Sequence, residues 1–429
     1  MVGTQKYQRW IFVINSSAAI ALVAIAATIA VWGAQPAQAQ TFTVLHNFTY
    51  GADGAEPEDG LTFDAAGNLY GTAAVGGVGY PYGTVFELSK RNSSWVFDPV
   101  FNNFTGIGEN PGAFPTSGVT IGPNGSLYAT TFGGGASCNC GIVFNLRPSP
   151  TRPVSALPRW NETVLDEFTA GSDGGFPQYG TLVFDQAGNL YGTTFGEFGS
   201  GGNGTVYELS PSGEGWTQDI IYSFTGGSDG GGPYSGVIFD HAGNLYGTAY
   251  EGGESNHGTV FELSPSASGW TEKTLHIFQG GSDGSGPIAS LTMDAASNLY
   301  GTTCGGGSQS GGTVFELAPS GDNWSHTVLY NFTARSCPEG SLTFDAAGNL
   351  YGTTLEGGAY DLGSVFKLTN SNGGWTFSSV HDFSGGDGEY LYGNWVTLDG
   401  QGNIYGMTAG GGTGSACAGG CGVVFEITP

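Results

Sequence analysis

One ten-residue phrase recurs seven times along this chain of 429 residues, and it restricts the folds open to the chain. Copies beginning at Phe63 and Phe344 both read Phe-Asp-Ala-Ala-Gly-Asn-Leu-Tyr-Gly-Thr. The Asp-x-x-Gly-Asn turn between two β-rich runs predicts a hairpin, because glycine accepts positive φ and the Asp and Asn side chains bond to their own backbone. The phrase returns every 51 to 63 residues, with its tyrosine at Tyr70, Tyr128, Tyr191, Tyr246, Tyr300, Tyr351 and Tyr405.

Two further strands are expected in each unit. A glycine-rich loop leads to a run such as Gly83 to Leu88, and a turn then leads to a run that begins near a tryptophan and ends in a phenylalanine. Four short strands in roughly 50 residues are typical of a propeller blade. We therefore predict an all-β, seven-bladed β-propeller of four-stranded blades, forming a single domain over residues 40–429. The repeated tryptophans are expected to pack between blades, and they are Trp95, Trp160, Trp216, Trp270, Trp324 and Trp375.

The two ends of the repeated region complement each other. The seventh unit stops at Pro429 without a fourth strand, whereas Phe42 to Phe48 resembles fourth-strand segments such as Leu275 to Phe278. We predict that this N-terminal strand completes the last blade, which closes the ring and removes two exposed sheet edges. An open solenoid is the alternative, and it would leave both terminal units incomplete.

Residues 1–39 have the pattern of a signal peptide. Lys6 and Arg9 precede an apolar stretch from Ala18 to Trp32, and Ala37-Gln38-Ala39 is a small-x-small cleavage site. The alternative is an uncleaved anchor helix, since the apolar stretch can be extended back to Ile11. The expected location is secreted or periplasmic, in a bacterium, where cysteines form lasting disulfides.

The negative charge of the chain argues against anionic partners, both nucleic acids and membrane surfaces. There are 36 acidic and 10 basic residues, so the surface repels phosphate backbones and anionic lipid headgroups. We expect no nucleic-acid partner, no membrane contact beyond the leader, and a monomer.

The repeated phrases, Asp-x-Ala-Gly-Asn-Leu-Tyr-Gly-Thr-Thr followed by Gly-Thr-Val-Phe-Glu-Leu, resemble the GloVer tandem-repeat family of bacterial exported proteins. The resemblance covers essentially everything after residue 41. It implies export and a propeller-like repeat array, and it carries no established activity or catalytic residues. The hairpin phrase is also similar to that of NHL-type propellers, which implies that Leu61 to Asp64 and their equivalents line a central channel.

A carboxylate recurs in the segments that lead into five of the seven units. These aspartates are Asp53, Asp173, Asp229, Asp283 and Asp387. A ring of carboxylates on one face suits calcium, which takes six to eight oxygen ligands. The alternative is that Asp-Gly is turn chemistry at a blade junction, and no EF-hand-like series is present.

The six cysteines fall into three neighbouring pairs. Disulfides are expected for Cys304 with Cys337 and for Cys417 with Cys421, because the chain lacks the histidine or Cys-x-x-Cys elements of a zinc site. The pairing of Cys138 with Cys140 stays open, since the ring that it closes is small.

Candidate ligand contacts are the aromatic residues that break the repeat. They lie in predicted loops, where propellers place variable residues, and they are Tyr80, Tyr82, Phe132, Phe195, Phe198, Tyr250, Tyr360, Tyr390 and Tyr392. His46, His276 and His381 occupy one repeated strand position, and no Gly-x-Ser-x-Gly elbow is present, so the sequence predicts no catalytic residue and no cofactor besides calcium.

These observations favour a non-enzymatic extracellular or periplasmic binding scaffold that recognises a glycan or a surface protein. One alternative is a polysaccharide- or lactone-active hydrolase or lyase that uses the central channel, and another is a purely structural surface protein with no small ligand. A cluster of non-repeated carboxylates at one channel mouth would favour the enzyme.

Overall fold

The computed structural model describes residues 40–92, 94–101, 103–108, 111–148, 160–196, 202–213, 215–371 and 374–429. The predicted signal peptide and Phe198 lie outside these described residues. Residues Phe42–Thr428 form one compact unit. Among the described residues, no helix is long and apolar enough to span a membrane.

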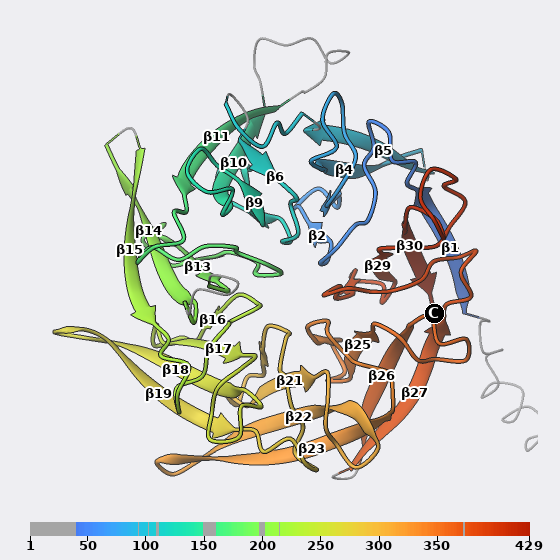
Figure 1. The fold of residues 1–429 in the computed structure, drawn as a ribbon. Helices are drawn as coiled ribbons and strands as arrows, with labels where there is room; N and C mark the ends of the chain where they lie inside the picture. Colours follow the sequence, from blue (N-terminus) through green and yellow to red (C-terminus); the bar gives the residue numbers. More distant parts are fainter. Residues whose placement is uncertain are drawn as a thin grey trace, which may run out of the picture. The chain divides into compact units, whose positions relative to one another are not determined.

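Seven four-stranded antiparallel sheets form the blades of a propeller (Figure 1), so the predicted fold class is confirmed. The first strand of each sheet is only two residues long. The first three blades are β2 (Thr62–Phe63), β3 (Leu69–Ala73), β4 (Thr84–Arg91) and β5 (Ser94–Phe101); β7 (Thr120–Ile121), β8 (Leu127–Thr131), β10 (Ile142–Pro148) and β11 (Trp160–Glu167); and β12 (Val183–Phe184), β13 (Leu190–Thr194), β14 (Thr205–Ser212) and β15 (Gly215–Ser223).

The remaining blades repeat this order, and Figure 1 shows the long fourth strands at the rim. Blades four to seven are β16 (Ile238–Phe239), β17 (Leu245–Ala249), β18 (Thr259–Ser266) and β19 (Gly269–Ile277); β20 (Thr292–Met293), β21 (Leu299–Thr303), β22 (Ser310–Ser320) and β23 (Asn323–Thr333); β24 (Thr343–Phe344), β25 (Leu350–Thr354), β26 (Ser364–Ser371) and β27 (Gly374–Asp382); and β28 (Thr397–Leu398), β29 (Ile404–Thr408), β30 (Val423–Thr428) and β1 (Thr41–Asn47).

The ring closes through strand β1, as the ends of the repeats predict. β1 lies beside β30 in the order β1-β30-β29-β28, and the Phe48 amide donates to the Gly422 carbonyl at 3.1 Å. The last blade is therefore built from both ends of the described chain.

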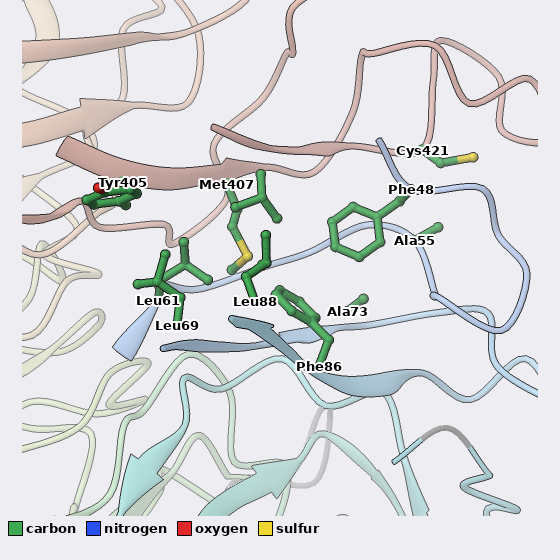
Figure 2. Close-up of a cluster of buried hydrophobic side chains, with 11 residues drawn as sticks. Phe48, Ala55, Leu61, Leu69, Ala73, Phe86, Leu88, Tyr405, Met407 and Cys421 are labelled. Atoms are coloured by element: carbon green, nitrogen blue, oxygen red, sulfur yellow. The ribbon is translucent and has the colours of Figure 1, made fainter. Parts of the chain in front are cut away.

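The core lies between neighbouring blades. Figure 2 shows Phe48 and Met407 of blade seven packed with Leu61 and Phe86 of blade one, and all four side chains are buried. Each repeated tryptophan packs edge-on against the repeat tyrosine of the preceding blade, with ring centroids 5.7 to 6.4 Å apart. The pairs are Trp95 with Tyr405, Trp160 with Tyr70, Trp216 with Tyr128, Trp270 with Tyr191, Trp324 with Tyr246 and Trp375 with Tyr300.

The repeated phrase forms the predicted hairpin between the first two strands. In blade one, Asp64 Oδ1 accepts the amides of Ala66 and Asn68 at 2.8 Å, and Oδ2 accepts Asn68 Nδ2 at 2.8 Å. The Asp and Asn of the phrase therefore fix the turn through their own backbone.

The segment between one blade's fourth strand and the next blade's first strand is here called the lead-in loop. It pairs with the loop that follows the second strand, through bridges such as Ala55 with Val75 and Gly231 with Glu251. A second-strand threonine also donates to a lead-in carbonyl of the next blade, as Thr72 does to Ser117 at 2.9 Å. The two kinds of loop therefore share one face, and neighbouring blades are tied together there.

Candidate functional site

One position of the lead-in loop varies strongly between blades. It lies three residues before the buried aliphatic residue that directly precedes the first strand of each blade, which is Leu61, Val119, Leu182, Val237, Leu291, Leu342 or Val396. The variable position is occupied by Glu58, Thr116, Tyr179, Tyr234, Ile288, Glu339 and Gly393, here called the mouth ring.

Contacts bring mouth-ring residues of distant blades together. The Tyr179 hydroxyl donates a hydrogen bond to Glu58, and the Tyr179 ring stacks on Tyr234 with centroids 6.4 Å apart. A Cβ atom placed on Gly393 would lie 2.9 Å from Tyr179 Cδ1. Residues of blades one, three, four and seven can meet in this way only near the axis of the ring, at the mouth of its central channel.

The two mouth-ring glutamates carry raised pKa values. Burial, with repulsion by Glu56 and Glu339, raises the pKa of Glu58 to about 8 even though the Tyr179 hydroxyl lowers it. Burial raises the pKa of Glu339 to about 7, against a hydrogen bond from the Gly393 amide and with repulsion by Glu356. At neutral pH Glu58 is therefore largely protonated and Glu339 partly protonated, and both side chains retain some exposure to solvent.

Asp59, next to Glu58, joins blades one and two. Its carboxyl group is 1 % exposed and accepts the Gly118 amide and, at 3.1 Å, the Gly60 amide. Burial raises the pKa of Asp59, and these two hydrogen bonds only partly offset it. Asp59 therefore fixes the mouth ring in place.

Trp395 closes the channel beneath the mouth ring. The equivalent positions in other blades carry small residues, and a Cβ on Gly60 or Gly118 would collide with the Trp395 indole. Trp395 also lines a cavity of about 230 Å³ together with innermost-strand residues such as Val183, Ile238 and Thr343. The innermost strands therefore line the channel, and the Trp395 indole lies among them.

Two of the predicted ligand contacts, Phe195 and Tyr250, extend the mouth ring outward. Tyr234 packs against the Phe195 ring at 4.5 Å and against the Tyr250 ring at 5.1 Å. Tyr250 lines a recess of about 310 Å³ with Glu251, His257 and Cys304 among others. Tyr179, Tyr234, Phe195 and Tyr250 therefore form one continuous group of rings, here called the aromatic row.

The other predicted aromatic contacts are distributed over the same loops. Tyr80, which is 55 % exposed, and Tyr82 line a separate groove of about 450 Å³. Phe132 packs on Phe176 at 5.5 Å, and Tyr360 is 62 % exposed.

Tyr390 and Tyr392 lie beside the mouth ring. Their ring centroids are 6.3 Å apart. Burial raises the pKa of Tyr392, and repulsion by Glu339 and Glu58 adds to it, so this hydroxyl lies close to the glutamates.

The five lead-in aspartates hold their own loops. Asp53 accepts the Thr49 amide at 3.0 Å and His46 Nε2 at 3.1 Å, and Asp387 accepts His381 Nε2 at 2.9 Å. The other three also accept backbone amides of their own loops, and they are Asp173, Asp229 and Asp283. These contacts are the turn chemistry considered above, and calcium binding by this set stays a prediction.

The cysteines form three disulfides, Cys304–Cys337, Cys417–Cys421 and Cys138–Cys140, the last being the pair that sequence left open. Cys337 Sγ lies 3.2 Å from Glu339 Oε1, so the disulfide between blades five and six positions this glutamate. In the part of the chain that is described, Cys304, Cys337 and Glu339 are the one group of three potential metal-ligand side chains within 4.8 Å, and the disulfide occupies both sulfurs. Three disulfides suggest an exported protein.

Three overlapping segments, residues 30–194, 156–337 and 268–429, match the model of the Gloeobacter/Verrucomicrobia repeat. The chain belongs to the Gloeobacter/Verrucomicrobia repeat family. Among curated proteins, no relative was found.

Solved structures similar to this Gloeobacter/Verrucomicrobia repeat protein are distant in sequence. The extracellular domain of a candidate hybrid two-component system from B. thetaiotaomicron is 14 % identical with a TM-score of 0.53, over 89 % of this chain and 39 % of that one. The surface component PorZ of the type-IX secretion system of Porphyromonas gingivalis is 12 % identical with a TM-score of 0.49, over 86 % and 46 %. A candidate glucose dehydrogenase from Thermus is 15 % identical with a TM-score of 0.42, over 90 % and 99 %. The first of these supports the propeller fold, and this chain spans well under two thirds of that protein.

Sequence reasoning missed the residues that make the mouth of this Gloeobacter/Verrucomicrobia repeat protein. Glu58, Tyr179, Tyr234, Glu339 and Trp395 were not predicted as site residues. The available signal was a comparison of the repeats position by position, since the lead-in loop has one place where the units carry Glu, Thr, Tyr, Ile or Gly.

Proposed function

We propose that this protein is an exported, non-enzymatic binding protein that holds a carbohydrate at the mouth of its propeller. The observation that carries the proposal is the aromatic row. Its central ring, Tyr234, contacts the other three rings, and Tyr179 at one end of the row hydrogen-bonds to Glu58. Flat aromatic surfaces pack against the apolar faces of sugar rings, and adjacent carboxyl and phenol groups hydrogen-bond to sugar hydroxyls. The repeated tryptophans pack between blades and leave this role to the non-repeated rings.

The disulfides support a secreted or periplasmic location. The position of Trp395 supports binding of a chain end or a short segment at the mouth, because its indole lies against Gly60 and Gly118 and obstructs the channel.

The test is binding of soluble polysaccharides to the purified protein, followed by Tyr234→Ala. Losing the central ring of the row should weaken binding tenfold or more, the equivalent of about 1.4 kcal/mol. Tyr50→Ala removes an exposed ring outside the aromatic row and should leave binding unchanged. Absence of binding to every polysaccharide, or equal losses in the two variants, would refute the proposal.

A second candidate, a polysaccharide- or lactone-active hydrolase or lyase, is favoured by one observation. Glu58 and Glu339 belong to different blades, are not repeated, and have pKa values of about 8 and 7, which suit proton donors near neutral pH. Cleavage of a polysaccharide that Glu58→Gln abolishes would select this candidate over a binding protein, whereas binding without any cleaved product would reject it.

A further inference from the structure

Several carboxyl groups gather at the mouth of the propeller, and none of the described basic side chains balances their charge. Glu58 interacts with Glu56 and Glu339, and Glu339 interacts with Glu356. Within the described residues, no lysine or arginine contributes to the electrostatic surroundings of Glu58, Asp59 or Glu339. Carboxyl groups gathered without a counter-charge disfavour ionisation, unless something from outside supplies the charge.

Two buried polar side chains at the mouth each have an oxygen without a hydrogen-bond partner among the described residues. Asn394 is fully buried between the loops that carry the two glutamates, because its Nδ2 donates to the Pro57 carbonyl at 3.4 Å and the preceding amide donates to Glu339. Its Oδ1 has no hydrogen-bond partner among the described residues. Thr116, the mouth-ring residue of blade two, is 9 % exposed, and its hydroxyl is likewise without a partner there. Buried polar atoms are usually satisfied, so these two point to a donor that the chain itself does not supply.

Aromatic rings flank the same carboxyl groups. Tyr179 donates to Glu58, Tyr234 stacks on Tyr179, and Tyr392 lies close enough to both glutamates for their charges to raise its pKa. Ring faces attract cations, and cages of aromatic and acidic side chains are a common means of holding an organic ammonium group.

We propose that the mouth ring binds a primary ammonium group carried by a sugar, so that the ligand is an amino-sugar polymer with free amines. An ammonium group has three donors and no acceptor, which complements Glu58, Glu339 and the unpaired oxygen of Asn394. A bare divalent ion fits less well, because no three carboxyl side chains of the described chain bring their oxygens within 4.8 Å of one another. This inference rests on the proposed carbohydrate function and names its ligand class.

Binding of an amine should release protons from the site. At pH 7 Glu58 and Glu339 are largely or partly protonated, and a neighbouring ammonium favours their ionised forms. The other titratable groups that face them are Glu56, Asp59 and Glu356, together with the mouth tyrosines. A neutral sugar provides no charge to drive this ionisation.

The experiment compares a glucosamine hexamer with an N-acetylglucosamine hexamer by calorimetry at pH 6, where the amines are mostly charged and both glutamates are protonated, in two buffers of different ionisation enthalpy. The glucosamine hexamer should bind at least tenfold more tightly and with proton release, whereas the acetylated hexamer should release none. Glu339→Gln and Glu58→Gln should each cut that preference at least tenfold. Asp322→Asn removes the same charge from an exposed hairpin turn and should leave the preference intact.

The possible results separate the two proposals. Equal affinity for the two hexamers, or binding of other glycans but of neither hexamer, would overturn the ammonium inference and leave carbohydrate binding standing. No binding of any glycan would overturn both. Equal losses in Asp322→Asn and Glu339→Gln would show general attraction to an acidic surface and would overturn the mouth-ring assignment. Thermal melts of the glutamine variants should match or exceed the unsubstituted protein, which excludes misfolding as the cause of a loss.

Discussion

Replacing Tyr207 by phenylalanine should stabilise the protein. Tyr207 is fully buried in blade three, and its hydroxyl has no hydrogen-bond partner among the described residues. Burial, with the nearby Asp166, raises its pKa, so the group stays a neutral phenol. Removing a buried hydroxyl that makes no hydrogen bond removes its desolvation cost and leaves no partner unpaired.

The phenylalanine side chain left by this substitution already occupies the equivalent position in the other six blades. In blade four, the Phe261 ring packs directly on Gly247, with its Cζ atom 2.5 Å from the place that a Cβ on this glycine would take. The Tyr207 ring packs on Gly192 in the same way, with its Cζ atom 2.6 Å from the corresponding place. Phenylalanine also occupies this position in the other five blades, at Phe86, Phe144, Phe315, Phe366 and Phe425.

The expected gain is the desolvation cost of the hydroxyl, about 1 to 3 kcal/mol. A unit the size of Phe42–Thr428 has an unfolding entropy of roughly 0.8 kcal/mol per kelvin, so the melting temperature should rise by about 1 to 4 °C.

Differential scanning calorimetry and urea unfolding of Tyr207→Phe measure this change, and Phe261→Tyr is the matched control. The control should be destabilised, because it buries a hydroxyl against Gly247. A lower melting temperature for Tyr207→Phe would show that the hydroxyl makes a stabilising bond and would refute the reasoning.

Three further changes test other parts of the molecule. Burial, with the neighbouring His276, lowers the pKa of His326 from 6.5 to about 4, so the unfolded chain binds this proton first as pH falls and the histidine's contribution to stability drops by about 2 kcal/mol between pH 7 and pH 5. In urea titrations, the unfolding free energy of His326→Phe relative to the unsubstituted protein should therefore rise by about 2 kcal/mol over this range, and a difference that stays constant with pH would contradict the shift. Replacing both cysteines of Cys304–Cys337, which are 33 residues apart, should lower the unfolding free energy by about 4 kcal/mol, whereas replacing Cys417 and Cys421, which are 4 residues apart, should lower it by about 2 kcal/mol. The difference is expected because a disulfide that closes a longer loop restricts the unfolded chain more, and equal losses by calorimetry would contradict this. Trp395→Gly should lower the unfolding free energy by about 2 kcal/mol, since it leaves a void above the channel cavity, and unchanged urea stability would show that the indole does not plug the channel.

The propeller fold was predictable because the residues that form each hairpin turn are close together in the sequence and recur from unit to unit. The turn around Asp64 and Asn68 is fixed by hydrogen bonds within five residues, and the same bonds recur in later units. The closing strand β1 was predictable because its residues resemble the fourth strands of complete units.

The mouth site was not predictable in the same way. Glu58 and Glu339 are 281 positions apart, and Tyr179 lies between them in sequence, so each alone looks like ordinary loop variation. Their chemistry arises from mutual proximity and burial, which only the closed ring provides. Local signals in the sequence favour the repeated aspartates, whose carboxylates accept hydrogen bonds from amides of their own loops.

Ring closure has a consequence for how this chain reaches its folded state. Strand β1 at Thr41–Asn47 pairs with β30 at Val423–Thr428, so β1 cannot form its hydrogen bonds until β30 is available. A chain that is synthesised or threaded through an export channel from its N-terminus therefore carries an unpaired β1 until nearly every residue has emerged. The mouth ring, which draws residues from both early and late blades, is assembled only at that final step, so a truncated product would lack the site even if most of its blades had formed.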